Sequence, residues 1–436
     1  MPDWSGLLEQ LETCVGSDAL CTGPDGLPID EVPVRAVCSP AAVTELCEVV
    51  RIASAAQCPI YPLGGRTQLG LGLPGRGEGI GLSTAQLDRV IDYPSRDMTI
   101  TVEAGIRVAK LQEILRAEGQ RLPVDVPRAA EATLGGAIAT NTSGPRRYGL
   151  GTLRDYVIGI TVVGADGKET KAGGRVVKNV AGYDLCKLYI GSLGTLGIIT
   201  QVTLKLRPLP EASAVVWMKF EQSELVTTAL DRLVNSKTRS TAIDLVNPAG
   251  AELIANLLGQ PVPCGPWLLV VGFEANAEAV QGQVEQVQQE LKELVTWSQP
   301  FEGEEAQQIW RALVEFQAAE IGLVTFKANF RSSATVEFLD AAQRQPVSWM
   351  VHAHAGNGIV FGHALPGANR AAVQSSLAML RALAVSRSGN LVFRRCPTEW
   401  KAELAIWGEP RGDAWLMQSI KQKLDPMNIL NPGRII

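Results

Sequence analysis

Residues 64–79 read GGRTQLGLGLPGRGEG, and this glycine-rich stretch decides between different kinds of nucleotide-binding fold. Its central part, Gly70–Gly75, matches the G-x-G-x-x-G pattern of dinucleotide-binding Rossmann turns. A Rossmann turn opens a helix directly after its strand. Here Leu71–Gly79 contains Pro74 and four glycines, so no helix is expected and the match is interpreted as accidental. A Walker loop is excluded because no Gly-Lys-Ser/Thr follows.

The residues at the start of the stretch favour another kind of anion site. The segment Pro59–Leu63 is predicted to be a strand that ends at Gly64 and Gly65. Consecutive glycines let successive backbone N–H groups point into one concavity, and Thr67 adds a hydroxyl donor. The segment YPLGGRTQLG is therefore a candidate pyrophosphate loop. The alternative, for this loop alone, is a flexible surface turn.

Composition indicates a globular protein of about two domains. The chain has 436 residues, of which 46% are hydrophobic and 19% charged, with a formal net charge of −5. Scattered basic residues give no sign of nucleic acid or anionic membrane as a partner. No leader pattern opens the sequence MPDWSGLLEQLE, and no apolar run is long enough to span a bilayer.

The eight cysteines form no C-x-x-C pair and no ferredoxin-type spacing. Neither an iron–sulfur cluster nor a structural zinc is expected in this chain. We interpret the cysteines mainly as reduced packing thiols of a cytoplasmic protein.

Periodicity divides the chain near Pro208 and Pro210. Before them we expect a helix that begins at Ser39-Pro40, a helix from Val108 to Gly119, and a hairpin turning at Asp166-Gly167. After them apolar strands alternate with polar helices, which predicts an antiparallel sheet backed by helices. The expected strands are 32–37, 59–63, 98–103, 156–164, 168–172, 199–207, 215–220, 267–273, 349–354 and 391–394, and the later helices are 278–294, 370–384 and 414–424.

Two further glycine-rich stretches lie in the first part of the chain. They are ATLGGAIATNTSGPRRYG (132–149) and VVKNVAGYDLCKLYIGSLGTLGIITQVTLKLRP (176–208). In both, small and hydroxyl residues border the glycines, so that a flat ligand could approach the backbone.

With the loop after Leu63, these stretches resemble the FAD-binding domain of the vanillyl-alcohol oxidase or p-cresol methylhydroxylase (PCMH) type. The closing DPMNILNPGR is similar to the tail of the D-2-hydroxyacid dehydrogenase branch of that family. The resemblance implies an α+β fold: a PCMH-type FAD-binding domain of two α+β subdomains, then the C-terminal domain of FAD-linked oxidases. The implied organisation is an N-terminal extension (1–30), an FAD domain (31–210), a substrate domain (211–410) and a tail that returns to the flavin (411–436).

The resemblance also implies which residues bind the cofactor. Residues 64–68 would contact the pyrophosphate, the middle segment would line the flavin and ribityl chain, and 197–199 would meet the adenosine half. Arg66 either pairs with phosphate or points outward. The residues are Gly64, Gly65, Arg66, Thr67, Gln68, Pro127, Thr133, Gly135, Gly136, Asn141, Ser143, Gly144, Gly197, Ile198, Ile199 and Asn431. Many relatives tether the flavin through a histidine, but the only histidines here are His352, His354 and His363, so non-covalent FAD is expected.

The catalytic part of the family pattern is incomplete. The family motif H-x-H-x-G-D-G-N-x-x-H corresponds here to VHAHAGNGIVFGH, with Asn357 in place of aspartate and Phe361 in place of the last histidine. No later Glu-His pair follows, so no metal is assigned. His352, His354 and Lys327 remain the candidate catalytic residues. For the two histidines a metal pair, polar contacts to the flavin, and ordinary packing stay open.

The chain is similar to the smaller FAD-binding subunits of glycolate oxidase complexes, on the segments VVKNVAGYDLCKL, HAGNG and IWGEPRGDAWLMQSIKQKLDPMNILNPGR. This implies a cytoplasmic oxidoreductase of 2-hydroxy acids such as glycolate or D-lactate. Its partners would be a larger catalytic FAD subunit and an iron–sulfur subunit, through which any membrane association would be made. The alternatives are a self-sufficient FAD-dependent D-2-hydroxyacid dehydrogenase and a structural FAD-binding scaffold subunit.

Overall fold

A computed structural model describes residues 3–22, 34–174, 184–410 and 412–435. The chain divides into two compact units. The first contains residues 1–142, 152–209 and 410–436, and the second contains 143–151 and 210–409. Residues 176–183 of the segment VVKNVAGYD (176–184) lie outside the described residues. The first two residues of the strand expected at 32–37 also lie outside them.

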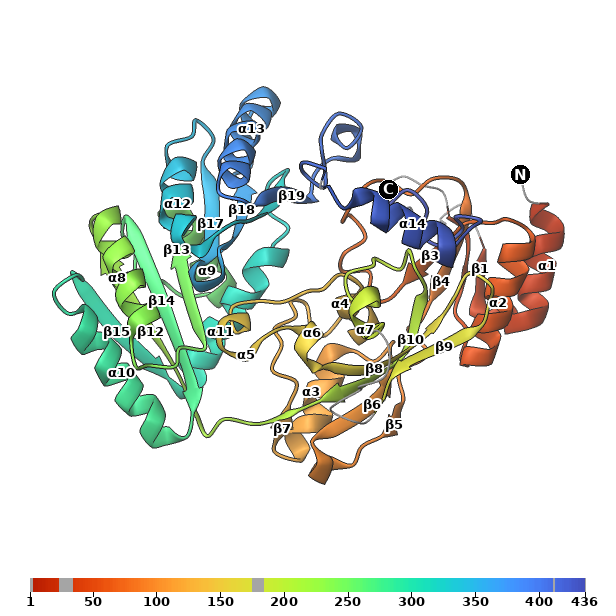
Figure 1. The fold of residues 1–436 in the computed structure, drawn as a ribbon, viewed down its shortest axis with the longest axis horizontal. Coiled ribbons are helices and arrows are strands. Elements are labelled where there is room, and N and C mark those ends of the chain that lie inside the picture. The colour runs from red at the N-terminus through yellow and green to blue at the C-terminus, as the bar shows by residue number, and fades with distance from the viewer. Residues whose placement is uncertain (1–2, 23–33, 175–183, 411, 436) are drawn as a thin grey trace. The chain divides into compact units, whose positions relative to one another are not determined.

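The first unit begins with a small sheet on which the glycine loop is mounted (Figure 1). Its central strand pairs in parallel with a neighbour on each side, and the first strand is added antiparallel at one edge. Two helices pack beside it through Leu7, Leu11, Leu46 and Val50, which are buried. In order the strands are β1 (Leu20–Thr22), β2 (Val34–Cys38), β4 (Gly79–Ser83) and β3 (Ile60–Leu63), and the helices are α1 (Trp4–Val15) and α2 (Val43–Ala55).

The start of α2 corrects the sequence prediction. The helix begins at Val43, not at Ser39-Pro40, and its N-cap is Ala42 in an extended conformation. The carboxylate of Glu45 accepts the N–H of Ala41 at 2.8 Å, so an acidic side chain of the first turn serves this end of the helix. After β3 the chain runs through a loop directly into β4, which confirms that no Rossmann helix opens there.

A second sheet completes the first unit. Its five strands are antiparallel, and the expected hairpin joins β8 to β9 with Gly167 at φ 67°. The apolar residues of α3 pack against it, and α3 is followed by Gly119 at φ 67°. In order the strands are β5 (Val90–Asp92), β6 (Thr99–Glu103), β10 (Ile198–Lys205), β8 (Val157–Val163) and β9 (Glu169–Gly173). The remaining elements are α3 (Val108–Ala117), α4 (Leu134–Ala139), α6 (Leu153–Tyr156), α7 (Cys186–Tyr189) and the pair β7 (Gln120–Arg121) and β11 (Arg207–Pro208).

The second unit is the predicted antiparallel sheet backed by helices (Figure 1). All of its strand pairs are antiparallel. In order they are β15 (Trp297–Glu302), β12 (Ala212–Phe220), β14 (Trp267–Ala275), β13 (Ala242–Val246), β17 (Trp349–His354), β18 (Ile359–Ala364), β16 (Thr325–Asn329) and β19 (Asn390–Arg395). The helices are α5 (Arg147–Leu150), α8 (Ser223–Asn235), α9 (Pro248–Leu258), α10 (Ala277–Leu291), α11 (Gly303–Glu315), α12 (Thr335–Gln343) and α13 (Arg370–Ser386).

One face of this sheet packs against α9 and α11, with Trp217, Trp310 and Phe361 in the core. Gly272 of β14 is required there, because a Cβ atom at that position would lie 2.3 Å from the Trp310 ring. The indole N–H of Trp310 donates to the Ser213 hydroxyl at 2.9 Å, so the large buried ring leaves no polar atom unsatisfied.

After the second unit the chain returns to the first one. Helix α14 (Ala414–Leu424) leads into a tail whose Leu430 forms a parallel bridge with Ile60 of β3. Five of the eight cysteines are buried, as expected for packing residues. In the described part of the chain, no helix has the length and apolar character needed to cross a membrane.

Candidate functional site

A large pocket opens in the first unit where the separate glycine-rich segments meet. Its walls come from the loop after β3, from α4 and the residues that flank it, from residues 193–199 up to the start of β10, and from the C-terminal tail. The lining residues are Tyr61–Leu69, Leu71, Thr84, Val126, Pro127, Ala132, Thr133, Gly135–Ala137, Ala139, Thr140, Thr142, Leu193, Gly194, Gly197–Ile199, Asn431 and Arg434. Together with the open solvent at its mouth, the pocket encloses about 1030 Å³.

Glycines allow these segments to approach one another closely. A Cβ atom on Gly64 would lie 2.2 Å from the hydroxyl oxygen of Thr133, and one on Gly65 would lie 2.0 Å from the carbonyl oxygen of Glu131. Thr133 is the N-cap of α4, and its hydroxyl accepts the N–H of Gly136 at 3.2 Å. The first two motifs found in the sequence therefore pack directly on each other and form one cradle.

The pocket suits an anionic group. Its described lining contains no acidic residue and two arginines, Arg66 and Arg434. Arg66 has φ 59°, a left-handed conformation that turns neighbouring amides toward a common side. Within the described residues, the backbone N–H groups of Arg66 and Thr67 donate no hydrogen bond. These donors are the groups that a pyrophosphate would need.

Most of the predicted cofactor residues lie in this one pocket. The exceptions are Asn141, Ser143 and Gly144, which are not among the lining residues. Ser143 and Gly144 belong to the second unit, where Ser143 accepts hydrogen bonds from Gln317 at 3.0 Å and from Arg147 at 2.9 Å. Asn141 is half-buried with φ 49°, and its buried side-chain oxygen accepts no hydrogen bond within the described structure.

Sequence reasoning missed Arg434, which lines the pocket three residues after the predicted Asn431. A basic residue just after Pro-Gly near the end of the chain was the available signal. Nothing local distinguishes it from a surface arginine, because its partners are more than 300 residues away in sequence.

The second unit holds a buried cluster of one carboxylate and two imidazoles. His352 and His354 lie two residues apart on β17 and point to the same face of the sheet, as alternation predicts. Nε2 of His352 and Nδ1 of His354 each lie 3.0 Å from a different carboxylate oxygen of Asp244 on the neighbouring strand β13. The three residues are at most 2% exposed.

The charge state of this cluster follows from its contacts. Burial alone would raise the pKa of Asp244, but the two imidazoles, His354 foremost, hold it at about 2. Burial lowers the pKa of His354 against the opposing effect of Asp244. An ionised carboxylate only accepts, so the imidazole nitrogens facing it carry the protons. On the other side of the rings, neither Nδ1 of His352 nor Nε2 of His354 has a hydrogen-bond partner in the described structure, and because the pKa of His354 is lowered its Nε2 presents a lone pair.

The third histidine has a structural role. Nε2 of His363 donates to the carbonyl of Phe316 at 2.8 Å, and its Nδ1 lies 3.0 Å from the Thr325 hydroxyl. Burial lowers the pKa of His363 to about 4, so the ring is neutral with both nitrogens satisfied. His352 and His354, each with one unpartnered nitrogen, are the histidines available for chemistry.

A half-buried lysine lies on the same face of the sheet. Lys327 of β16 is paired with Phe361 of β18, and Phe361 is in turn paired with His352. The pKa of Lys327 is lowered to about 7, mainly by desolvation and then by the nearby positive charges of Arg394 and Arg147. Among the described residues Lys327 has no hydrogen bond or ion pair, and its nearest ring contact is Phe361, 5.8 Å from Nζ to the centroid. A half-buried cation without an anion beside it is suited to binding a carboxylate.

Asp244 is the residue of this cluster that sequence reasoning missed. Its ligand atom and those of His352 and His354 lie within 4.8 Å of one another, a spacing that could hold a metal ion. Both carboxylate oxygens are already engaged by imidazole N–H groups, so the cluster as it stands is a hydrogen-bonded network. The available signal was an acidic residue inside the otherwise apolar strand Ala242–Val246.

Two family models match segments of both units. Residues 34–173 match the FAD binding domain family, and residues 209–369 and 410–435 match the C-terminal domain of FAD linked oxidases. The second match includes the tail, although in the structure the tail belongs to the first unit.

Two curated relatives cover different amounts of the chain. Glycolate oxidase subunit GlcD of Bacillus subtilis (strain 168) is 26% identical over 94% of this chain and 91% of its own length. Glycolate oxidase subunit GlcE of Escherichia coli (strain K12) is 36% identical, but over only 38% of this chain and 48% of its own length.

A solved structure supports the fold. The p-cresol methylhydroxylase structure with substrate bound has a TM-score of 0.75 at 17% identity, and the match covers 99% of this chain and 96% of that one. The expected PCMH-type fold with an FAD-linked oxidase C-terminal domain is confirmed. FAD is the cofactor that these two domains bind and use. The chain therefore belongs to the FAD-linked oxidases and is an FAD-dependent oxidoreductase.

Proposed function

We propose that this chain is the FAD-binding subunit of a glycolate or D-lactate dehydrogenase complex, and that it oxidises a 2-hydroxy acid and passes the electrons to a partner subunit. Two relatives that are named as glycolate oxidase subunits support the substrate class and the membership of a complex. The observation that carries the proposal is the buried Asp244–His354 pair with an unpartnered cation, Lys327, on the same face of the sheet.

Oxidation of a 2-hydroxy acid needs an acceptor for the hydroxyl proton and a cation for the carboxylate. Nε2 of His354 is the proposed proton acceptor, because Asp244 holds the opposite nitrogen protonated and stabilises the imidazolium that forms. Lys327 is the proposed partner of the substrate carboxylate, whose charge would raise the lysine pKa again. When bound, FAD would supply the hydride acceptor for the α-carbon of the substrate, so that the 2-hydroxy acid becomes a 2-oxo acid.

The unit 1 pocket is the proposed FAD site, with residues 64–68 holding the pyrophosphate. We propose that FAD is bound without a covalent tether. All three histidines belong to the second unit, no cysteine lines the pocket, and the pocket's one tyrosine, Tyr61, donates its hydroxyl to backbone carbonyls of Arg76 and Gly77. We assign no metal to the Asp244 cluster, since both carboxylate oxygens are occupied. A cytoplasmic location and an iron–sulfur partner remain part of the proposal.

The test is an anaerobic visible spectrum of the purified full chain before and after glycolate or D-lactate is added. The proposal expects a flavin band that bleaches, because the hydride is transferred on this chain. A flavin band that stays oxidised with both acids would show that the substrate is oxidised elsewhere, as in a scaffold subunit.

The same experiment addresses a self-sufficient dehydrogenase, which the completeness of the Asp244–His354 pair favours. Adding ferricyanide or dichlorophenolindophenol supplies a soluble electron acceptor. Sustained turnover with the acceptor, at a rate that the partner subunits do not increase, would favour the self-sufficient enzyme. A single bleaching event followed by slow reoxidation would favour the subunit.

A further inference from the structure

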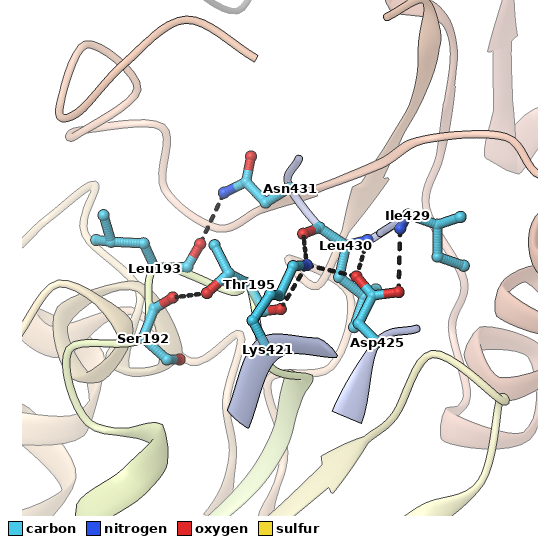
Figure 2. A network of polar contacts seen from close by, with 8 residues as sticks. All are labelled: Ser192, Leu193, Thr195, Lys421, Asp425, Ile429, Leu430 and Asn431. Carbon is cyan, nitrogen blue, oxygen red and sulfur yellow. Dashed lines mark hydrogen bonds and ion pairs between the residues drawn. The ribbon is translucent and has the colours of Figure 1, made fainter. Parts of the chain in front are cut away.

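The C-terminal tail holds two loops of the flavin pocket at once. Figure 2 shows the first attachment, centred on Lys421 of α14. Its ammonium donates to the carbonyls of Thr195 at 2.9 Å and Leu430 at 2.8 Å and to the carboxylate of Asp425. Asp425, 1% exposed, also accepts the N–H groups of Ile429 and Leu430. These contacts fix the start of the tail against the 192–195 loop.

The tail then runs along β3, the strand that leads into the glycine loop. The N–H of Ile60 donates to Ile429 at 2.7 Å, and the N–H of Asn431 donates back to Ile60 at 2.8 Å. The side-chain amide of Asn431 donates to the carbonyl of Leu193 at 2.7 Å, as Figure 2 shows. The tail is thus a further strand-like edge of the sheet beside the pocket.

The last described turn of the tail contacts the far limb of the glycine loop. The guanidinium of Arg434 donates to the carbonyls of Leu73 at 2.9 Å and Leu69 at 2.6 Å, and the N–H of Leu73 donates to the carbonyl of Arg434 at 3.1 Å. Arg434 is only 4% exposed and lines the pocket, whereas Arg66, the other arginine in the lining, is exposed. Its positive charge is therefore held in place and poorly screened by water.

We propose that Arg434 is a positioning residue of the cofactor site: it fixes the Leu69–Leu73 limb of the glycine loop and supplies the buried positive charge that the phosphates of FAD require. The tail is then part of the binding site. This inference rests on the proposed placement of FAD in the unit 1 pocket.

The test compares dissociation constants for FAD, ADP and riboflavin, measured on the full-length apoprotein of wild type, Arg434→Gln, Arg434→Lys and Lys423→Gln. Hydrogen bonds to a charged group contribute enough that Arg434→Gln should weaken FAD at least about tenfold. Binding of ADP, which carries phosphates, should weaken by a similar factor. Binding of riboflavin, which carries none, should weaken by less than about threefold. The FAD affinity of Arg434→Lys should lie between those of wild type and Arg434→Gln, because lysine keeps the charge but cannot donate to two carbonyls in the same way. Lys423→Gln removes an exposed charge on the same tail and should match wild type.

Hydrogen exchange supplies a readout that a general loss of stability would not imitate. In wild type, FAD should protect the amides of residues 69–73 and 429–434 together, and in Arg434→Gln this joint protection should disappear. Equal FAD affinity in wild type and Arg434→Gln would overturn the role of Arg434 alone. Equal weakening of riboflavin and ADP would also overturn it, by indicating a structural effect. A wild-type protein that binds FAD nowhere in this pocket would overturn the proposed cofactor site as well.

Discussion

The cofactor pocket of the first unit is formed mainly by backbone atoms, whereas the histidine cluster of the second unit is formed by side chains. The pocket is made of backbone: Gly64 and Gly65 pack against Thr133 and Glu131 at distances that exclude any side chain. The cluster is made of side chains on neighbouring strands, where Asp244 bridges His352 and His354. In the proposed function, the first construction would hold FAD by its shape and its backbone amides, and the second would accept one proton while Lys327 beside it binds the substrate carboxylate. The two should therefore fail independently.

The largest effect is expected at Gly136, which lines the pocket. A Cβ atom there would meet only the Thr133 hydroxyl, at 3.1 Å, so a substitution would require only a small shift of that one side chain. Gly136→Asp places a carboxylate where we place the phosphates, and like charges in contact cost several kcal/mol, or a hundredfold or more in FAD affinity. The measurement is the FAD dissociation constant by flavin fluorescence, with Gly136→Ala as the control for size.

Gly135 is a poorer choice for this test. Its Cβ atom would lie 2.9 Å from Ala104 Cβ and 3.0 Å from the Ala104 carbonyl, so a substitution would disturb the packing of α4 as well as the pocket. If Gly136→Asp purifies with a full complement of FAD, the pyrophosphate does not lie beside α4.

Asp244→Asn should have the next largest effect, and on catalysis alone. Each carboxylate oxygen of Asp244 accepts from one imidazole, whereas an asparagine side chain has one accepting oxygen and one donating NH2 group. The NH2 group would therefore face one of the two rings, and the hydrogen bonds that fix the tautomer of His354 would be lost. The rate of flavin reduction by substrate should fall by about 10²- to 10⁴-fold, the usual contribution of a general base. The flavin content should stay normal, because the pocket lining belongs to the first unit.

The matched control is Asp231→Asn, an exposed acid on α8. Thermal unfolding of both variants shows whether burial of the new amide destabilises the second unit. A fast Asp244→Asn enzyme with normal flavin content would mean that the Asp244–His354 pair is not the base.

Lys327→Met should act on substrate binding more than on the chemical step. Methionine fills a similar space without the charge, so the contact to the carboxylate is lost. We expect KM for glycolate or D-lactate to rise about 10- to 100-fold, with a smaller change in kcat. Steady-state kinetics check this, and Lys292→Met, an exposed lysine after α10, is the control. An unchanged KM would remove Lys327 from the site.

The pH profile should show the smallest effect. Lys327 must be charged to bind a carboxylate, and because its pKa is lowered to about 7, kcat/KM should fall above pH 7, by about tenfold per unit. His354 must be neutral, and its pKa lies below the usual 6.5, so the acid limb falls below that pH. Lys327→Arg should shift the alkaline limb by more than two pH units upward. If the limb does not move, another group sets it.

Sequence alone predicted the pocket better than the cluster, and the reason is physical. Glycine spacing and hydroxyl caps act over a few residues, so the loop after β3, the N-terminus of α4 and the strands of both sheets could be expected from local pattern. The identity of the cofactor as FAD was inferred from the resemblance to the PCMH-type family. The start of α2 at Val43 was missed because Glu45 serves that end in place of Ser39.

The misses that matter for function depend on pairing between distant segments. Asp244 meets His354 only because β13 pairs with β17 in one register, 110 residues apart in sequence. Arg434 reaches Leu69 across 365 residues. Ser143 and Gly144 belong to the second unit although they follow a predicted flavin segment without a break. No local pattern encodes such pairings.

The central claim is that one unit holds the flavin while the Asp244–His354 pair of the other takes the proton. The most direct measurement is the anaerobic stopped-flow rate of flavin bleaching by glycolate or D-lactate in wild type and His354→Ala, at equal flavin content. The account predicts that both proteins carry FAD and that the variant bleaches at least a hundredfold more slowly. Equal bleaching rates, or a variant that has lost its FAD, would contradict it.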